Sequence, residues 1–145
     1  MTSSPLQSAL LALALAIGAG AAWLGLSGDP SATPCPAGAS RMVRLELVFG
    51  LSRKGRPDIA EAEWRLFLDR EVTPRFPDGL TVLAGDGQWR NPAGVAVKEP
   101  ARMLLVWVKP AADLGPRIDA VRAAWKQAHN QESVLRAEGS SCVSF

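Results

Sequence analysis

The sequence predicts an α+β domain in which an antiparallel sheet carries both of its helices on one face. Two patterns support this prediction: apolar residues alternate with polar ones in the strand segments, and they recur at helical spacing in two longer segments. The segments follow one another as strand, helix, strand, strand, helix, strand. This βαββαβ order is typical of ferredoxin-like folds with four antiparallel strands. An N-terminal hydrophobic helix is expected to precede the domain.

The first strand and the first helix are predicted from alternation and from a helix-start signal. Residues 43–49 alternate as a strand with one buried face does. Asp58 and Glu61 have the spacing of a capping box at the start of a helix, and Pro74 ends that helix. The apolar stripe expected along one side of the helix consists of Ala60, Trp64, Phe67, Leu68 and Val72.

The middle of the domain is predicted to contain short strands separated by turns. Turn-forming residues divide it into a strand at 80–84, a turn at Gly85-Asp86-Gly87, a short returning piece at 88–90, a second turn at 91–94 and a further short strand at 95–98. The apolar run 103–108 indicates a central strand that is buried on both faces.

The last third of the domain predicts a helix and a closing strand. Asp113 is placed to cap the helix, and His129-Asn130 to end it. Its apolar side is expected to carry Ile118, Val121, Trp125 and Ala128. Residues 133–138 form the last full strand in this prediction, and 142–145 add an edge. The first and third strands are the most apolar, so they are expected at the centre of the sheet.

The N-terminal segment 1–26 is predicted to be a signal peptide or a membrane anchor, because residues 6–26 carry no charge. Small residues after an apolar core suit a cleavage site, although no Lys or Arg precedes that core. An uncleaved anchor needs about 20 apolar residues, and Trp23 has the position of an interfacial aromatic. A buried helix of a soluble protein is the third interpretation. Either of the first two places the domain in the periplasm or outside the cell, secreted or anchored, with membrane contact only through residues 6–26.

Residues 27–40 are predicted to be a flexible linker, and residues 41–145 a single domain. The linker is rich in Ser, Gly, Pro and Ala. It contains Cys35, and the second cysteine of the chain is Cys142. In an exported protein such a pair indicates a disulfide, and two unrelated thiols are the alternative.

Composition excludes several classes of function. The net charge is +2 and the basic residues form no stripe, so a nucleic-acid partner is not expected. Two cysteines and one histidine are too few for a structural zinc site. His129 is interpreted as a helix-terminal cation, because the helix dipole favours a positive charge at that end. No Ser-His-Asp order and no phosphate loop is present. No cofactor and no metal are therefore expected.

The connection between the first helix and the second strand has an unusual sequence, TPRFPDG, at residues 73–79. Its two prolines restrict the backbone and its Asp-Gly pair favours a turn. In a functional interpretation Arg75 contacts an anion, and Thr73 or Asp78 forms hydrogen bonds beside a pocket. In a structural interpretation the segment is a rigid connection in which Phe76 closes the core and Arg75 lies near enough to Asp78 to pair with it.

A wider binding site is predicted if Trp89 and Arg90 converge with Arg75, Asp78 and Glu132 at one end of the sheet. An aromatic ring beside a guanidinium group can hold an anionic small molecule. The alternative is that Trp89 covers an exposed edge of the sheet.

The segment TPRFPDG is similar to the hallmark of an uncharacterised bacterial family, a domain of unknown function in small proteins with exported leaders. The likeness extends over about residues 41–145 and includes other segments, namely 62–64 with 67–68, 80–83 with 87–90, 131–136, and 142–145. The resemblance implies export and a single domain. It assigns no catalytic residue.

The function predicted from these patterns is that of an envelope-located binding or interaction module. Its recognition surface would combine residues 73–79 with the hairpin at 85–90. The alternative is a small ferredoxin-like enzyme that acts on a small anionic molecule at the open face of the sheet near residues 73–79, with Arg75 and Asp78 as polar groups. A structural envelope component is a third interpretation. The partner is expected to be a second copy, another envelope protein or an unidentified small molecule.

Overall fold

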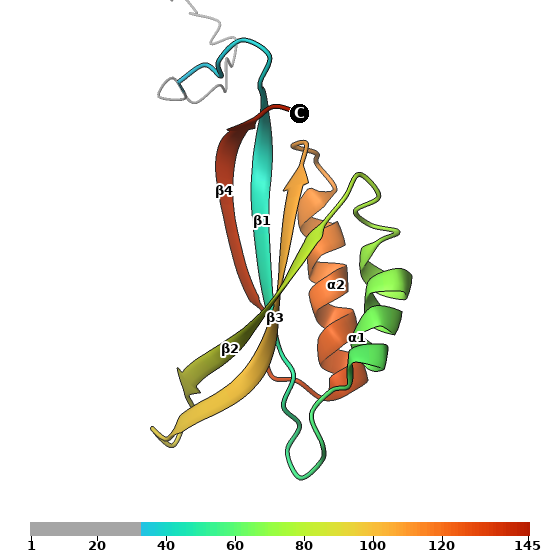
Figure 1. Ribbon diagram of the computed structural model, residues 1–145, viewed down its shortest axis with the longest axis vertical. Helices are drawn as coiled ribbons and strands as arrows, with labels where there is room; N and C mark the ends of the chain where they lie inside the picture. Colours follow the sequence, from blue (N-terminus) through green and yellow to red (C-terminus); the bar gives the residue numbers. More distant parts are fainter. Residues whose placement is uncertain (1–32) are drawn as a thin grey trace, which may run out of the picture. The chain divides into compact units, whose positions relative to one another are not determined.

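The computed structural model of the 145-residue chain describes residues 33–145, shown in Figure 1. The predicted hydrophobic helix, and with it the choice between signal peptide and anchor, lies outside the described residues, as does linker segment 27–32. Residues Pro34–Phe145 form one compact unit. Within the described part of the chain, no helix combines the length and the apolar character needed to cross a membrane.

The described residues form an α+β domain with a four-stranded antiparallel sheet and two helices, as predicted. The strands are β1 (Ser40–Gly50), β2 (Thr81–Arg90), β3 (Ala96–Val108) and β4 (Leu135–Val143). The helices are α1 (Glu61–Phe67), which continues as the π-helical η1 (Leu68–Val72), and α2 (Leu114–His129). The strand order is β2-β3-β1-β4, so the two most apolar strands, β1 and β3, are central.

Both helices pack on one face of the sheet (Figure 1). Alternate residues of β1 and β3 point into this layer and are buried, namely Leu45, Leu47, Phe49, Leu104, Val106 and Val108. They meet an aromatic cluster of Phe49, Trp64, Phe67 and Trp125, whose ring centroids lie 4.8–5.9 Å apart. Most of these ring pairs meet edge to face, which is a favourable geometry for aromatic quadrupoles.

The first helix begins later than the sequence predicted. Ala60 is the N-cap residue, and the Glu63 carboxylate accepts a hydrogen bond from its backbone N–H at 3.0 Å. The predicted pairing of Asp58 with Glu61 is therefore wrong, because Asp58 instead accepts a hydrogen bond from the Ser52 hydroxyl at 2.9 Å. Ala60 is exposed at this N-terminus rather than part of the buried stripe.

The predicted turn at Gly85-Asp86-Gly87 is wrong, because β2 continues as one strand to Arg90. The chain reverses only at residues 91–95, where the Asn91 carboxamide accepts hydrogen bonds from the backbone N–H groups of Ala93 and Val95, each at 3.0 Å. Residues 86–90 pair with 96–100 beyond the end of β1, whose last partner on β3 is Ala101. We call these ten residues the ribbon. It bends away from the helices (Figure 1).

Two further strand predictions need correction. The run 103–108 is not buried on both faces, because Met103, Leu105 and Trp107 are partly exposed on the side away from the helices. The C-terminal segment forms one strand, β4, instead of a strand with a separate edge piece. At the start of α2, Asp113 makes no side-chain capping bond. It pairs with Arg117 at 3.2 Å.

Cys35 and Cys142 form a disulfide with their Cα atoms 5.4 Å apart. The bond joins the segment that precedes β1 to the end of β4. These strands are neighbours in the sheet, and Cys142 is paired with Arg41. The disulfide therefore reinforces an edge at which the chain enters and leaves the domain.

Candidate functional site

The segment 73–79, which we call the corner, connects η1 to β2 and is anchored to the core by Phe76. The Phe76 side chain is buried. From α2, the Arg117 guanidinium lies over the Phe76 ring at 5.7 Å and donates a hydrogen bond to the carbonyl of Arg75 at 3.0 Å. Two elements of the helical layer thus fix this connection.

The Arg75 side chain is held by Glu71 rather than by the Asp78 partner considered from the sequence. Its Nη1 donates to the Glu71 carbonyl at 2.6 Å and to the Glu71 carboxylate at 3.0 Å. Thr73 and Asp78 are exposed on the outside of the corner. This arrangement uses Arg75 to stabilise the last helical turn, and it fits a rigid connection better than a ligand site.

We expect Gly79→Ala to lower the free energy of unfolding by about 1–3 kcal/mol, the usual cost of a strained backbone conformation. Gly79 has φ of 132°, which L side chains rarely adopt. Urea unfolding followed by circular dichroism measures the change. Gly85→Ala is the matched control, because a Cβ atom there meets nothing within 4 Å and its φ is not positive. An equal decrease in the free energy of unfolding in the two variants would contradict backbone strain at position 79.

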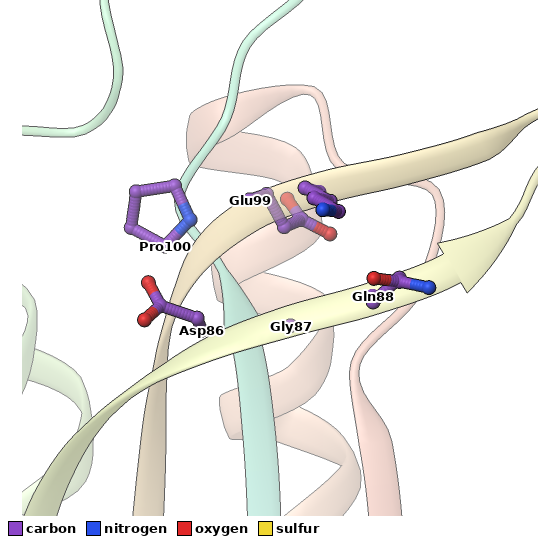
Figure 2. Close-up of a pocket in the computed structure, with 6 residues that line it drawn as sticks. Asp86, Gly87, Gln88, Glu99 and Pro100 are labelled. Atoms are coloured by element: carbon purple, nitrogen blue, oxygen red, sulfur yellow. The ribbon is translucent and has the colours of Figure 1, made fainter.

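The ribbon contains a shallow, open hollow of about 460 Å³. Figure 2 shows Asp86 and Gln88 on one strand, with Glu99 and Pro100 on its neighbour. The residues that line the hollow are Asp86, Gly87, Gln88, Lys98, Glu99 and Pro100. Carboxylate, carboxamide and ammonium groups can hydrogen-bond to polar ligands, so the hollow is a candidate site for a small molecule.

Glu99 is the most firmly positioned group of this hollow. Its carboxylate accepts a hydrogen bond from Trp89 Nε1 at 2.8 Å and a longer one from the Ser52 backbone N–H at 3.4 Å. Gly50 makes room for it, because a Cβ atom at that position would lie 2.5 Å from Glu99 Oε2. The Trp89 ring is thus oriented by Glu99 instead of lying free as a stacking surface.

The predicted site residues do not gather at one place. Trp89 and Arg90 lie at the far end of β2, a ten-residue strand that spans about 33 Å from the corner. Arg90 donates to the Gly94 carbonyl in the hairpin turn at 2.8 Å. Glu132 lies in the connection from α2 to β4, at the end of the sheet opposite the corner (Figure 1).

His129 lies against the core and not beside a nucleophile. Its ring packs on Trp125 with centroids 4.2 Å apart. Burial lowers the pKa of the imidazole below its usual value, with the charge of Glu63 opposing this effect and that of Arg53 adding to it. Among residues 33–145, no group of three or more His, Cys, Asp or Glu side chains is placed to hold a metal ion.

The side of the sheet away from the helices, which we call the open face, is uncovered, as the prediction of both helices on one face implies; which side chains lie on it was not predicted. Its large apolar side chains come from all four strands and include Val48, Leu83, Trp89, Val97, Met103, Leu105, Trp107 and Leu135, while Met42 at the start of β1 is buried. Leu83 is 48 % exposed, Trp89 43 % and Leu135 56 %. Charge is concentrated on β1, where Arg44 pairs with Glu46 and lies over the Trp107 ring at 5.8 Å.

The comparisons with known proteins show a family and a fold. The model of the family "Protein of unknown function (DUF3574)" matches residues 44–145, close to the extent expected from the sequence resemblance. The prediction of an uncharacterised family is thereby confirmed, while the role of TPRFPDG as its mark stays a prediction. No curated protein matches this chain at a significant level.

Solved structures of a phage SAM lyase resemble the domain. The complex with S-methyl-5'-thioadenosine has a TM-score of 0.56 and 12 % sequence identity, over 78 % of this chain and 95 % of the lyase. The apo lyase has a TM-score of 0.49 and 15 % identity, over 79 % and 97 % of the two chains. At this level of identity the first likeness describes the fold alone.

Proposed function

The chain belongs to the DUF3574 family of proteins of unknown function, and from that premise we propose that it is a small exported module that binds a protein partner through its open face. The observation that carries the proposal is the exposure of large apolar side chains across this face. Soluble monomers seldom leave such a contiguous surface uncovered, and larger exposed patches mark interaction sites. The ferredoxin-like topology is part of the proposal and is supported by the strand order.

The composition of the open face supports a protein partner. Tryptophan is enriched in protein interfaces because a large, rigid ring contributes much contact area. Trp89 and Trp107 both lie on this face, at its two ends. Glycine and alanine residues between the large side chains leave room for a partner to approach, for example Gly85, Ala101 and Ala137.

Export is supported by the disulfide and by the uncharged N-terminal stretch. Disulfides persist in oxidising compartments and are rare in the cytosol of most organisms. The Cys35–Cys142 bond fits such a compartment, and residues 6–26 have the composition of a leader or an anchor. We therefore propose a periplasmic or extracellular location, either secreted or anchored.

A second candidate function is a small enzyme, favoured by the fold that the domain shares with the phage SAM lyase. Its site would be the ribbon hollow, where the Glu99 carboxylate has a fixed position. The corner is less suitable for an anionic substrate, because Arg75 is already paired with Glu71. Binding of S-methyl-5'-thioadenosine by the full chain, lost in Glu99→Gln, would favour this candidate over the interaction module.

Site-specific photo-crosslinking tests the interaction module. A photoreactive amino acid at position 83 of the full chain is expected to give a protein adduct in the producing cells, detected on a denaturing gel. Position 66 is the matched control, because Leu66 has the same exposed fraction, 48 %, but lies on α1 in the helical layer. Adducts at neither position, or equally at both, would count against the open face as a recognition surface.

A further inference from the structure

We propose that the partner at the open face is a second copy of this chain, related to the first by a twofold axis. The two sheets would stack face to face, with Arg44 of each copy opposite Glu46 of the other. This inference rests on the proposed function, because it names the partner that the open face recognises. The self-complementary charges of the face point to a second copy as the partner.

The charges of the open face are self-complementary. Arg44 and Glu46 lie two residues apart on central strand β1, and both point away from the helices. Sheets that stack face to face keep their strands within about 30° of one another. A twofold axis that lies between the sheets and crosses β1 at Leu45 reverses one β1 over the other. Each Arg44 then meets the partner's Glu46, as an isologous interface requires.

Arg44 and Glu46 form an ion pair within each chain. A second copy places a further acidic group opposite Arg44 and a further basic group opposite Glu46, at the matching spacing. On the described part of the open face, the remaining charged residue of the strands is Glu99, which is occupied by Trp89 and Ser52. The paired region of β1 and β3 therefore presents one positive and one negative group surrounded by apolar side chains.

The stacked strands would cover only part of the open face. With the axis at Leu45, β1 and β4 lie over their own counterparts for most of their length, whereas β3, which pairs with β1 only from Val43 onward, overlaps over a shorter distance. At about 4.8 Å between strands and about 3.3 Å per residue, this overlap is roughly 350 Å². Side chains make the accessible area larger than this flat footprint, yet it stays below the roughly 800 Å² per partner of standard interfaces, so we expect a weaker association than a standard interface gives.

The ribbon lies outside this overlap. It continues for five residue pairs beyond β1 and bends away from the helices (Figure 1). Its base is held by the residues that follow β1, because the Leu51 N–H donates to the Pro100 carbonyl at 2.9 Å and the Ser52 N–H to the Glu99 carboxylate at 3.4 Å. In the stacked arrangement the ribbon of one copy extends past the start of the partner's β1.

Charge reversal in two differently tagged copies of the full chain tests this arrangement. Arg44→Glu gives a chain with two negative groups on the face, and Glu46→Arg a chain with two positive groups. We expect each variant to associate with itself at least about tenfold less than wild type, since like charges that face each other across an interface cost several kcal/mol. Co-expression of the two variants is expected to restore association, measured by capture on one tag and detection of the other.

Recovery in the mixture can come only from contacts between copies, because each chain still carries its own like-charge pair. Circular dichroism of each variant shows whether the fold is retained. Wild-type copies that fail to capture each other, or a mixture no better than either variant alone, would overturn the inference.

The same crosslinking experiment at position 105, which lies where the two copies would overlap, separates this inference from the proposed function. An adduct of twice the chain mass supports the second copy. An adduct with a different protein leaves the interaction module standing and contradicts self-association. A crosslink to residues 1–32 of the same chain shows that the chain covers its own face, and it contradicts both proposals.

Discussion

Phe49→Ala is expected to lower the free energy of unfolding by about 3–5 kcal/mol, the range for truncating a buried aromatic residue. Phe49 is fully buried. Its ring contacts Trp64 at 5.3 Å and Trp125 at 5.2 Å, with interplanar angles of 61° and 74°. Because these tryptophans belong to different helices, the cavity left by the phenyl ring loosens both helices against the sheet at once.

Urea unfolding monitored by tryptophan fluorescence measures this loss, since Trp64 and Trp125 are both buried in the cluster. Leu66→Ala is the control, because Leu66 is half exposed on α1 and its truncation is expected to change stability by less than about 0.5 kcal/mol. A Phe49 variant as stable as the Leu66 variant would show that the cluster does not hold the two layers together.

Removal of the disulfide is expected to produce the second large effect. Replacing Cys35 and Cys142 together by serine should lower stability by about 2–4 kcal/mol, mainly because the unfolded chain regains the freedom of a long loop. The two cysteines are separated by 107 residues. The measurement is the urea midpoint of the full chain under oxidising conditions.

A reducing agent provides the control for this variant. It should shift the midpoint of the wild-type chain by about the same amount and leave the double serine variant unchanged. A wild-type midpoint that does not respond to the reductant, once free thiols have been detected, would contradict the stabilising role of the bond.

The parts of the fold that could be predicted from the sequence are those in which one side of an element is buried. Residues 43–49 alternate because the helices cover only one side of β1. Trp64 and Trp125 lie on helical stripes for the same reason. In such elements apolar residues lie on the buried side and polar residues on the exposed side, so the pattern can be recognised within a short stretch of sequence.

The errors arose where local turn and cap propensities were overridden by contacts distant in the sequence. Glycine is typical of turns, so a turn was predicted at Gly85 and Gly87. Their pairing with Ala101 and Glu99 keeps both in an extended strand. The stronger signal was the Asn91 side chain, which closes the hairpin. Aspartate is likewise a common helix-capping residue, yet the Asp58 carboxylate accepts a hydrogen bond from the Ser52 hydroxyl in the loop before the helix.

The candidate site was less predictable because composition does not distinguish a covered face from an open one. Met103, Leu105 and Trp107 are as apolar as core residues, so the sequence suggested a strand covered on both sides. The unusual residues of the corner suggested a binding site. In the structure Phe76 is buried in the core and Arg75 is bonded to Glu71. Both helices were expected on one face, but the strand register that places Met103, Leu105 and Trp107 on the other face is set by pairing between distant segments.

The disulfide also determines how the domain responds to mechanical force. Tension applied from the N-terminal side of Cys35 passes through the bond to Cys142, and so it reaches β1 and β4 together. These two strands are joined by nine successive residue pairs from Ser40 to Val48. A tether attached before Cys35 therefore cannot peel β1 from its edge neighbour one hydrogen bond at a time, and the load is distributed along the paired strands.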